Sequence, residues 1–311
     1  MFSRRHFIAS AGTLTAAAWL SPRSLFAEEE NIVLTARKRA ETANITAQTL
    51  RGNVTGLIGS GGNIAVLTGP DGKIIIDSGY ATSRPKITEA LVKLSPDPIR
   101  HLINTHWHFD HCDGNEWMHS EGATIVAHTN TQKHLSTTTR VEDWKFTFPP
   151  SPAGAIPTGV FDQNQTLHLN STTIALAYYG PSHTDGDISA YFAEPDVLHC
   201  GDTWWNGHYP FIDYSTGGNI KGMIRAAEAN LARVTDKTIV IPGHGKIAGK
   251  PELTEYRDML VAIHDRVSAL KNSGKTLEQA IAAKVTADYD GKWATAFITG
   301  DFFTKLVYAG A

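Results

Sequence analysis

Four potential metal donors stand close together in the segment His-Trp-His-Phe-Asp-His: His106, His108, Asp110 and His111. Residues two apart in an extended chain point to the same side, so His106 and His108 can share one metal ion. A following turn can bring Asp110 and His111 to a second ion. Imidazole and carboxylate donors favour zinc, iron, manganese or nickel over calcium or magnesium. The spacing therefore predicts an open, catalytic site with two adjacent metal ions.

Three further donors follow, each in a loop next to an apolar strand. His183 lies in Gly-Pro-Ser-His, Asp202 in His-Cys-Gly-Asp and His244 in Pro-Gly-His-Gly. Functional residues are concentrated in such loops, which the flanking strands hold in place. We therefore expect all seven donors to contribute to one site.

Two cysteines, Cys112 and Cys200, stand beside these donors. Two thiols are too few for a disulfide scaffold or a closed cysteine-rich zinc site. We expect both side chains to pack as small buried groups, with metal ligation as the less favoured alternative. The aromatic residues near the donors fit a substrate pocket as well as they fit the core: Trp107, Phe109, Trp204, Trp205, Tyr209 and Phe211.

The elements that position these donors follow from alternating helical and extended patterns. A short helix is expected within residues 31–47 and a glycine-rich loop over 52–62, then a hairpin from strands 63–68 and 73–77. Further strands are expected at 99–104, 123–127, 165–169, 173–178, 188–192, 197–199 and 238–241. Helices are expected at 86–93, 115–118, 220–231, 252–270 and 277–284. The polar, proline-rich stretch 129–157 interrupts this alternation and predicts an insertion near the site.

The overall composition is that of a large globular chain. It has 311 residues, 41% hydrophobic and 19% charged, with 28 basic and 31 acidic residues and a net charge of -3. This balance gives no electrostatic footprint for nucleic acid, so we expect no nucleic-acid partner. The bulk charge does not identify a partner, and the small-molecule substrate that we expect follows from the predicted catalytic site. No repeat or linker divides residues 28–311, which predicts one domain with C-terminal helices over 252–311.

Residues 1–27 have the features of a twin-arginine export signal. The motif Ser-Arg-Arg-His-Phe at 3–7 precedes an apolar run, and Ala27 ends the segment. The run is too short and too interrupted for a bilayer-spanning helix. We expect cleavage after Ala27, a periplasmic or secreted protein, and no stable membrane association afterwards. The alternative is retention as an uncleaved anchor.

The order of the donors resembles the metallo-β-lactamase superfamily, in which a His-x-His-x-Asp-His cluster is followed by a loop His, an Asp and a Gly-His. The resemblance implies an α/β fold, also classed as α+β, built as a four-layer αββα sandwich with metals at one sheet edge. It implies that a first ion is bound by His106, His108 and His183, and a second by Asp110, His111 and His244. Asp202 would bridge both ions. Asp77 matches an acidic residue that ends an early strand, and we expect it to support the ligand loop by hydrogen bonds rather than act as an ordinary turn residue.

The implied chemistry is zinc-dependent hydrolysis, with iron or manganese as alternatives to two Zn²⁺. A hydroxide shared by two cations is deprotonated near neutral pH and remains nucleophilic enough to attack a carbonyl. Asp110 and Asp202 are the expected catalytic residues, and Asp110 is also expected to orient the hydroxide and carry its proton to the leaving group.

The substrate is less sharply indicated. Asp202 occupies the place of a Cys or Ser in dedicated β-lactamases and is more typical of thioester, lactone and phosphodiester hydrolases. The segment 111–115 departs from the His-x-Gly-Gly run of glyoxalase II enzymes. Expected export and the Ser-His-Thr loop at 182–184 favour a β-lactam, lactone or other ester or amide. A glyoxalase II-like thioesterase, a phosphodiesterase, a non-haem iron oxidoreductase and a non-catalytic metal protein stay open.

Overall fold

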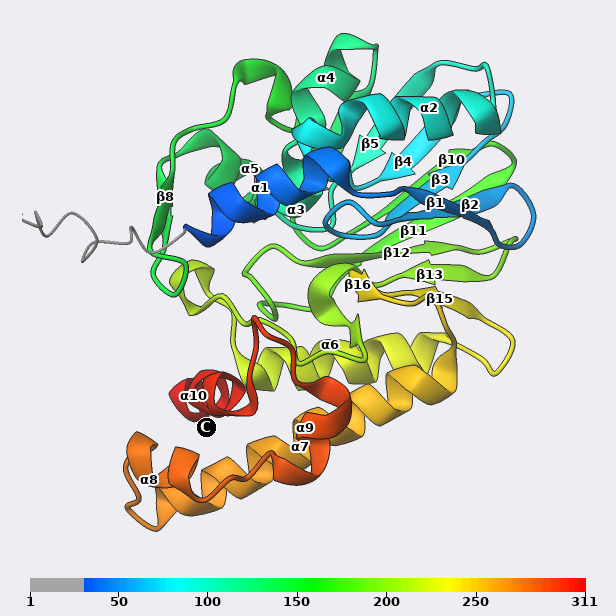
Figure 1. Cartoon of the computed structure of the whole chain (residues 1–311). Helices are drawn as coiled ribbons and strands as arrows, with labels where there is room; N and C mark the ends of the chain where they lie inside the picture. The colour runs from blue at the N-terminus through cyan, green and yellow to red at the C-terminus, as the bar shows by residue number, and fades with distance from the viewer. Residues whose placement is uncertain (1–30) are drawn as a thin grey trace, which may run out of the picture.

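The computed structural model describes residues 31–311, and the export signal expected at 1–27 lies outside the described residues. Two sheets pack face to face, with α2 (Arg84–Leu94) and α4 (Asn115–Ser120) over one and α6 (Ile220–Arg233) and α7 (Lys250–Asn272) beyond the other (Figure 1). These four layers confirm the expected αββα sandwich.

The first sheet has seven strands in the order β1-β2-β3-β4-β5-β6-β9. They are β1 (Thr46–Thr49), β2 (Val54–Ile58), β3 (Ile64–Leu67), β4 (Lys73–Ile76), β5 (Ile99–Ile103), β6 (Thr124–His128) and β9 (Gly159–Phe161). Strands β3 and β4 form the expected antiparallel hairpin, whereas β5 pairs parallel with β4. Both hairpin strands are buried throughout, as expected for strands covered on both faces.

The second sheet has five strands in the order β10-β11-β12-β13-β15. They are β10 (Asn164–Leu169), β11 (Thr172–Tyr178), β12 (Ile188–Phe192), β13 (Val197–His199) and β15 (Ile239–Ile241). Apolar side chains of the two sheets, such as Ile76, Ile103, Ile174 and Phe192, form one buried cluster between them. This close-packed layer holds the strand ends, and hence the donor loops, in fixed relative positions.

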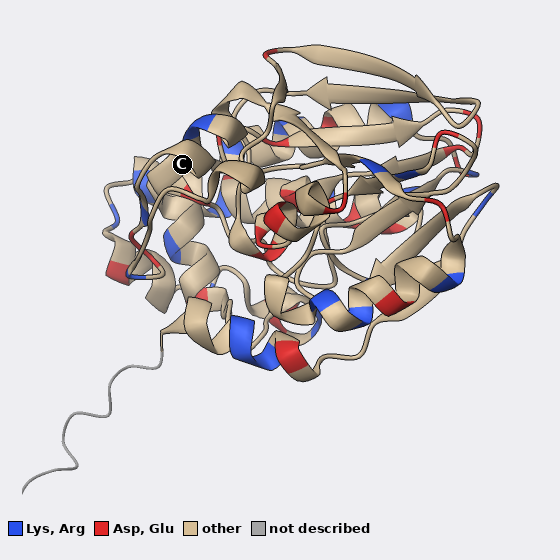
Figure 2. Cartoon of the chain, turned by 90° about the horizontal axis from the view of Figure 1, so that it is seen from above, with Lys and Arg blue, Asp and Glu red and all other residues tan. Residues whose placement is uncertain are grey.

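The remaining elements lie outside or beside the sandwich. They are α1 (Ile32–Thr42), α3 (Phe109–Cys112), α5 (Thr129–Ser136), β7 (Thr139–Val141), β8 (Phe146–Phe148), β14 (Trp205–Asn206), β16 (His244–Gly245), α8 (Leu277–Ala282), α9 (Ala287–Trp293), α10 (Gly300–Gly310) and the short 3₁₀ helices η1 (Ala81–Ser83), η2 (Ala153–Ala155), η3 (Gly201–Thr203) and η4 (Tyr214–Thr216). Within residues 31–311, no helix is both long and apolar enough to cross a membrane. Acidic and basic side chains are interspersed over the helices and loops (Figure 2).

One sequence expectation is wrong: the glycine-rich stretch 52–62 is not only a loop, because it contains strand β2. Gly56 hides the strand pattern, but it is required there, since a Cβ would lie 2.5 Å from Cδ1 of Ile247. The stretch 129–157 contains α5 and the β7–β8 hairpin, and it connects β6 to β9. Those two strands pair directly in parallel, so the stretch is inserted in the sequence while the sheet stays continuous.

Candidate metal centre

The ends of strands deliver the seven predicted donors to one edge of the sandwich. After β5, two residues lead into His106 and His108, and the short helix α3 carries Asp110 and His111. His183 lies in the loop between β11 and β12. Asp202 follows β13 in η3, and His244 starts β16 directly after β15. The structure therefore brings together all seven residues.

Their donor atoms form two groups, each with all atoms within 4.8 Å of one another. One group is His106, His108, His183 and Asp202; the other is Asp110, His111 and His244. Asp202 Oδ2 lies 3.4 Å from His183 Nε2 and 3.3 Å from His244 Nε2, and its Oδ1 lies 3.0 Å from His111 Nε2. Asp202 thus faces both groups, which is the position that a bridging ligand needs.

Several of these atoms are buried without a hydrogen-bond partner: the Nε2 atoms of His106, His111 and His244, and Oδ1 of Asp202. Buried polar atoms are normally paired, because an unpaired one loses its hydration without compensation. His108 Nδ1 and His183 Nε2 also point at each other, 2.9 Å apart. Convergent, unpaired nitrogen and carboxylate atoms are the donor set for a transition-metal ion, so the residues fit a metal centre.

Asp77, expected to support the ligand loop, lies directly behind His111. Its Oδ2 accepts a 2.7 Å hydrogen bond from His111 Nδ1 and another from Thr105 Oγ1, and its Oδ1 accepts one from the Thr105 amide. These bonds fix the His111 ring with Nε2 toward the cluster. The backbone of Asp77 has a φ of 63°, an uncommon conformation that this network stabilises.

Sequence reasoning missed the matching support behind the other group. Asp213 Oδ2 lies 3.0 Å from His108 Nε2 and also accepts a hydrogen bond from Thr216 Oγ1. His183 Nδ1 donates to the carbonyl oxygen of Phe211 at 2.7 Å. Asp213 sits in a loop 105 residues from His108 in sequence, so no local pattern connects them.

Two glycines let the chain approach the donors closely. A Cβ at Gly62 would lie 2.1 Å from the His111 ring, and one at Gly243 would lie 1.9 Å from Asp202 Oδ1. Any larger residue at either place would displace a donor. The glycine that precedes His244 is therefore part of the site.

Burial and neighbouring charges shift the pKa values of these histidines in opposite directions. Burial holds the pKa of His106 well below its ordinary value and lowers that of His183 to about 4. Burial acts in the same direction on His244, but Asp202 and Asp110 overcome it and raise the pKa of His244 to about 9. Carboxylates likewise hold the pKa of His111 well above its ordinary value against the effect of burial. Without metal at neutral pH, His106 and His183 therefore have free imidazole lone pairs, whereas His111 and His244 carry protons.

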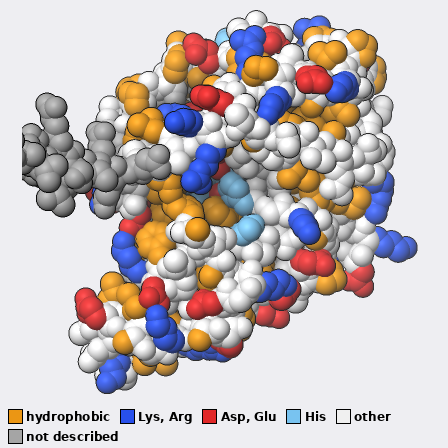
Figure 3. All heavy atoms as spheres, in the orientation of Figure 1, with side chains coloured by type: hydrophobic (Ala, Val, Ile, Leu, Met, Phe, Trp, Pro, Cys, Tyr) orange, Lys and Arg blue, Asp and Glu red, His pale blue; other side chains and the backbone are white. Residues whose placement is uncertain are grey.

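A cavity of about 650 Å³ opens over the donors. Figure 3 shows it as a hollow with histidine and hydrophobic atoms at its base. Its walls include Asp110, Asp202, His108, His183 and His244, so the candidate metal centre is reachable by a small molecule. We call these donors together with His106 and His111 the metal side of the cavity.

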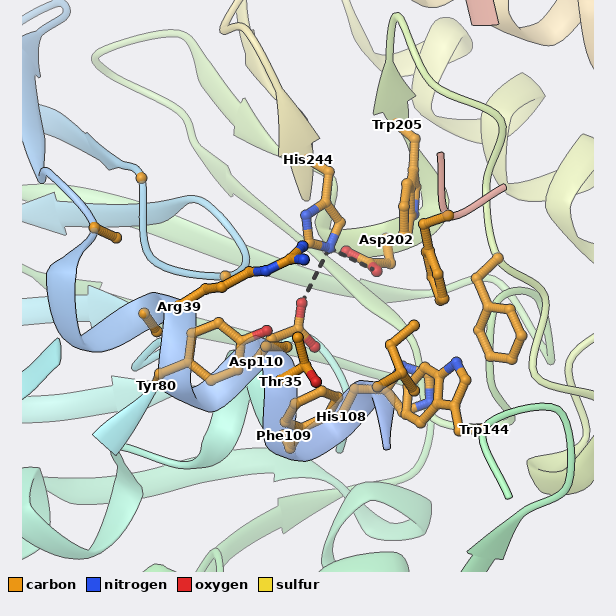
Figure 4. Close-up of a pocket in the computed structure, with 18 of the residues that line it drawn as sticks. Thr35, Arg39, Tyr80, His108, Phe109, Asp110, Trp144, Asp202, Trp205 and His244 are labelled. Atoms are coloured by element: carbon orange, nitrogen blue, oxygen red, sulfur yellow. Dashed lines mark ion pairs between the residues drawn. The ribbon is translucent and has the colours of Figure 1, made fainter. Parts of the chain in front are cut away.

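Further lining residues come from α1 and from the segment before α10, and we call them together the helix side. It contributes Ile32, Thr35, Ala36, Arg39 and Phe297, of which Thr35 and Arg39 are labelled in Figure 4. Sequence reasoning did not assign any of these to the site.

The aromatic residues split between pocket and core. Phe109, Trp205 and Phe211 line the cavity, together with Tyr80 and Trp144, which were not predicted. Trp107, Trp204 and Tyr209 are buried in the core.

Both cysteines are free and buried, as expected for packing groups. Cys112 Sγ bonds to the carbonyl oxygen of His106, and neither thiol belongs to a donor group among residues 31–311. His199 likewise serves the structure, because Nε2 bonds to Asn63 O and Nδ1 accepts from the Gly201 amide.

Comparison with known proteins places these features in a family. Over 149 residues, the chain is 28% identical to a hydroxyacylglutathione hydrolase of Rhodospirillum rubrum, covering 47% of this chain and 48% of that protein. Over 199 residues, it is 24% identical to a metallo-beta-lactamase type 2 of Bacillus sp. (strain 170), covering 64% and 72%. The chain therefore spans about half the length of the first relative.

A solved sec-alkylsulfatase from Pseudomonas sp. has a similar fold, with a TM-score of 0.62 at 15% identity. The likeness covers 88% of this chain and 51% of that one. The sequence model of the metallo-beta-lactamase superfamily matches residues 57–275, a span that contains all seven donors and Asp77. With more than half of its length matched and the donors in the expected order, the chain belongs to the metallo-beta-lactamase superfamily.

Proposed function

We propose that this protein is a dinuclear metal-dependent hydrolase that opens a β-lactam, a lactone or another ester or amide of a small molecule. The observation that carries the proposal is the convergence of seven donors at one accessible cavity, which five of them line. Names of relatives support hydrolysis, since one is a hydroxyacylglutathione hydrolase and another a metallo-beta-lactamase.

Two zinc ions are the proposed metals, because histidine and aspartate donors suit zinc in an open site. The first ion would be held by His106, His108 and His183, the second by Asp110, His111 and His244, with Asp202 shared. When bound, two such ions supply a nucleophilic water at neutral pH and polarise the bond to be cleaved.

The chain itself supplies proton handling. Asp110 lines the cavity, and its Oδ2 lies 3.2 Å from His244 Nε2. Burial opposes ionisation of Asp110, but His111 and His244 outweigh it and lower its pKa. Asp110 is therefore a carboxylate at neutral pH, which can accept a proton at the reacting bond and return it to the leaving group.

The walls favour a compact, partly apolar substrate. Phe109, Trp144, Trp205 and Phe211 line the cavity beside the donors. Aromatic walls exclude water and bind an apolar body, as in most small-molecule sites. A thioester is the second candidate, favoured by the 28% identity to the R. rubrum hydrolase.

The substrate class can be tested on zinc-loaded full-length protein with a β-lactam, a lactone, a thioester and a phosphodiester, together with metal analysis. We expect the highest kcat/KM with the lactam or the lactone and two zinc ions per chain. Highest turnover of the thioester would replace the first candidate with the second. Iron in place of zinc with oxygen uptake would indicate an oxidoreductase, and metal without any turnover a non-catalytic protein.

Export by the twin-arginine route is part of the proposal and is supported by the motif at residues 3–7. Processing after Ala27 should give a periplasmic or secreted chain that starts at Glu28. Cell fractionation with N-terminal sequencing tests this, using a variant with both arginines at 4 and 5 changed to lysine. Equal export of that variant would contradict the route.

A further inference from the structure

The helix side of the cavity carries a cation with no partner. Arg39 lies on α1 and lines the cavity, and it is the one lysine or arginine among the lining residues. Figure 4 shows its side chain extending toward His244 and Asp202. Within the part of the chain that the structure describes, the Arg39 side chain makes no ion pair or hydrogen bond, and it is exposed.

Its neighbour on the same helix behaves differently. Arg37 makes two hydrogen bonds to the Asp113 carboxylate, at 2.6 and 2.8 Å. Arg37 therefore anchors the helix, whereas Arg39 keeps all of its donors available. A guanidinium presents a planar fork of donors that matches a carboxylate, so an unpaired one at a cavity is suited to an anionic ligand.

The backbone of α1 is held firmly enough to position this group. Thr82 and Ser83 donate through their hydroxyl groups to the carbonyl oxygens of Arg37 and Ala40, at 2.8 and 2.7 Å. Lys86 donates to the carbonyl oxygen of Ala43, just beyond the helix. These bonds lie on both sides of Arg39 in sequence, so its Cα is fixed relative to the cavity while the side chain stays free.

The surroundings indicate the rest of the ligand. Besides Arg39 and the aromatic residues near the donors, the cavity is lined by Ile32, Ala36 and Phe297, which are all apolar. From these lining residues we infer that Arg39 forms an anion-binding subsite. The substrate then carries a carboxylate or similar anionic group close to the reacting bond, and an apolar body beyond that group. The inference rests on the proposed function, because that function supplies the reacting bond next to which the anionic group is placed. Arg39 itself lies outside the span 57–275 that matches the superfamily model.

Direct binding tests the subsite without needing turnover. The probes are 4-phenylbutyrate and the uncharged 4-phenylbutyramide, titrated calorimetrically into zinc-loaded full-length protein. We expect Arg39→Ala to weaken phenylbutyrate binding about tenfold and to leave the amide unchanged, since one exposed charge-assisted contact is lost. Arg39→Lys should retain part of the preference. Each variant keeps the metal ions, so any direct binding of the probe's carboxylate to metal contributes equally in all of them.

Lys38→Ala is the matched control, because Lys38 is the next residue on α1, exposed, and not among the cavity-lining residues. It should bind both probes as the wild type does. Equal weakening of both probes by Arg39→Ala, no weakening of either, or no binding of phenylbutyrate to the wild type overturns the subsite. If the binding difference appears but no ester, lactam or phosphodiester is cleaved, the proposed hydrolysis fails while the subsite stands.

Discussion

The metal side and the helix side of the cavity are built in opposite ways. On the metal side, His106, His111 and His183 are fully buried, and Asp77 and Asp213 hold the outer edges of two histidine rings. On the helix side, Arg39 and Phe297 are exposed and make no comparable polar network. The metal side lies inside the superfamily match and the helix side lies outside it.

This difference separates reactivity from recognition. Metal donors must be fixed within a fraction of an ångström, which only close packing and hydrogen-bonded support provide. Recognition of a substrate body tolerates looser contacts at the cavity rim. We therefore expect substitutions on the metal side to abolish metal binding or turnover, and those on the helix side to change mainly KM.

The largest effect is expected for Asp110→Asn. It removes a carboxylate that we propose both binds the second ion and carries a proton, so kcat/KM should fall at least about a thousandfold, equivalent to about 4 kcal/mol. Steady-state kinetics with metal analysis checks this. Asp236→Asn is the control, since the Asp236 side chain is 93% exposed and remote from the donors. Full metal content with undiminished turnover would exclude a catalytic role for Asp110.

The supporting carboxylates should have a smaller effect, each on its own ion. Asp77→Asn should lower the affinity for the ion held by His111 by about ten- to a hundredfold. Asp213→Asn should lower the affinity for the ion held by His108 by a similar factor. Competition with a chromogenic chelator measures the two affinities. If both variants weakened the same ion, or neither did, the assignment of one support to each donor group would be wrong.

The two donor groups should also differ in pH dependence. Below its pKa of about 9, His244 is protonated in the metal-free protein, so binding of the second ion must displace a proton. For each proton that binding displaces, the affinity of that ion should fall about tenfold per pH unit as the pH drops below 9. His183, with a pKa of about 4, is already neutral, so its binding to the first ion should release no proton between pH 6 and 8. Calorimetry in two buffers of different ionisation enthalpy counts the protons, and equal release by both ions would contradict the difference.

The smallest effect is expected on the helix side. Phe297 is 41% exposed at the cavity, and Phe297→Ala should raise KM about three- to tenfold with little change in kcat, because it removes apolar contact with the substrate body. Val160→Ala is the matched control, since Val160 is 42% exposed on β9 and does not line the cavity. A drop in kcat without a change in KM would show that the helix side takes part in the reaction itself.

The same division explains what the sequence could predict. Donors such as His106 and Asp202 sit in short motifs with characteristic spacing next to apolar strands, so their positions could be predicted. The four-layer sandwich was implied by the resemblance of their order to the superfamily. Asp213 could not be, because its link to His108 is a tertiary contact between distant loops. Arg39 could not be either, since a charged residue on an amphipathic helix looks like any solvated one until the helix is placed. Strand β2 was missed because Gly56 is selected by contact with Ile247 rather than by strand propensity.

The attachment of α1 has a consequence for how this protein can change over evolutionary time. The rest of the protein holds α1 in part through hydrogen bonds to main-chain carbonyl groups, those of Arg37, Ala40 and Ala43. Every amino acid provides such a carbonyl group. Cavity-facing residues such as Thr35 and Arg39 take no part in that grip. New side chains can therefore appear at the cavity-facing positions of α1 without loosening the helix, so substrate range can diverge there while the reaction chemistry is inherited unchanged.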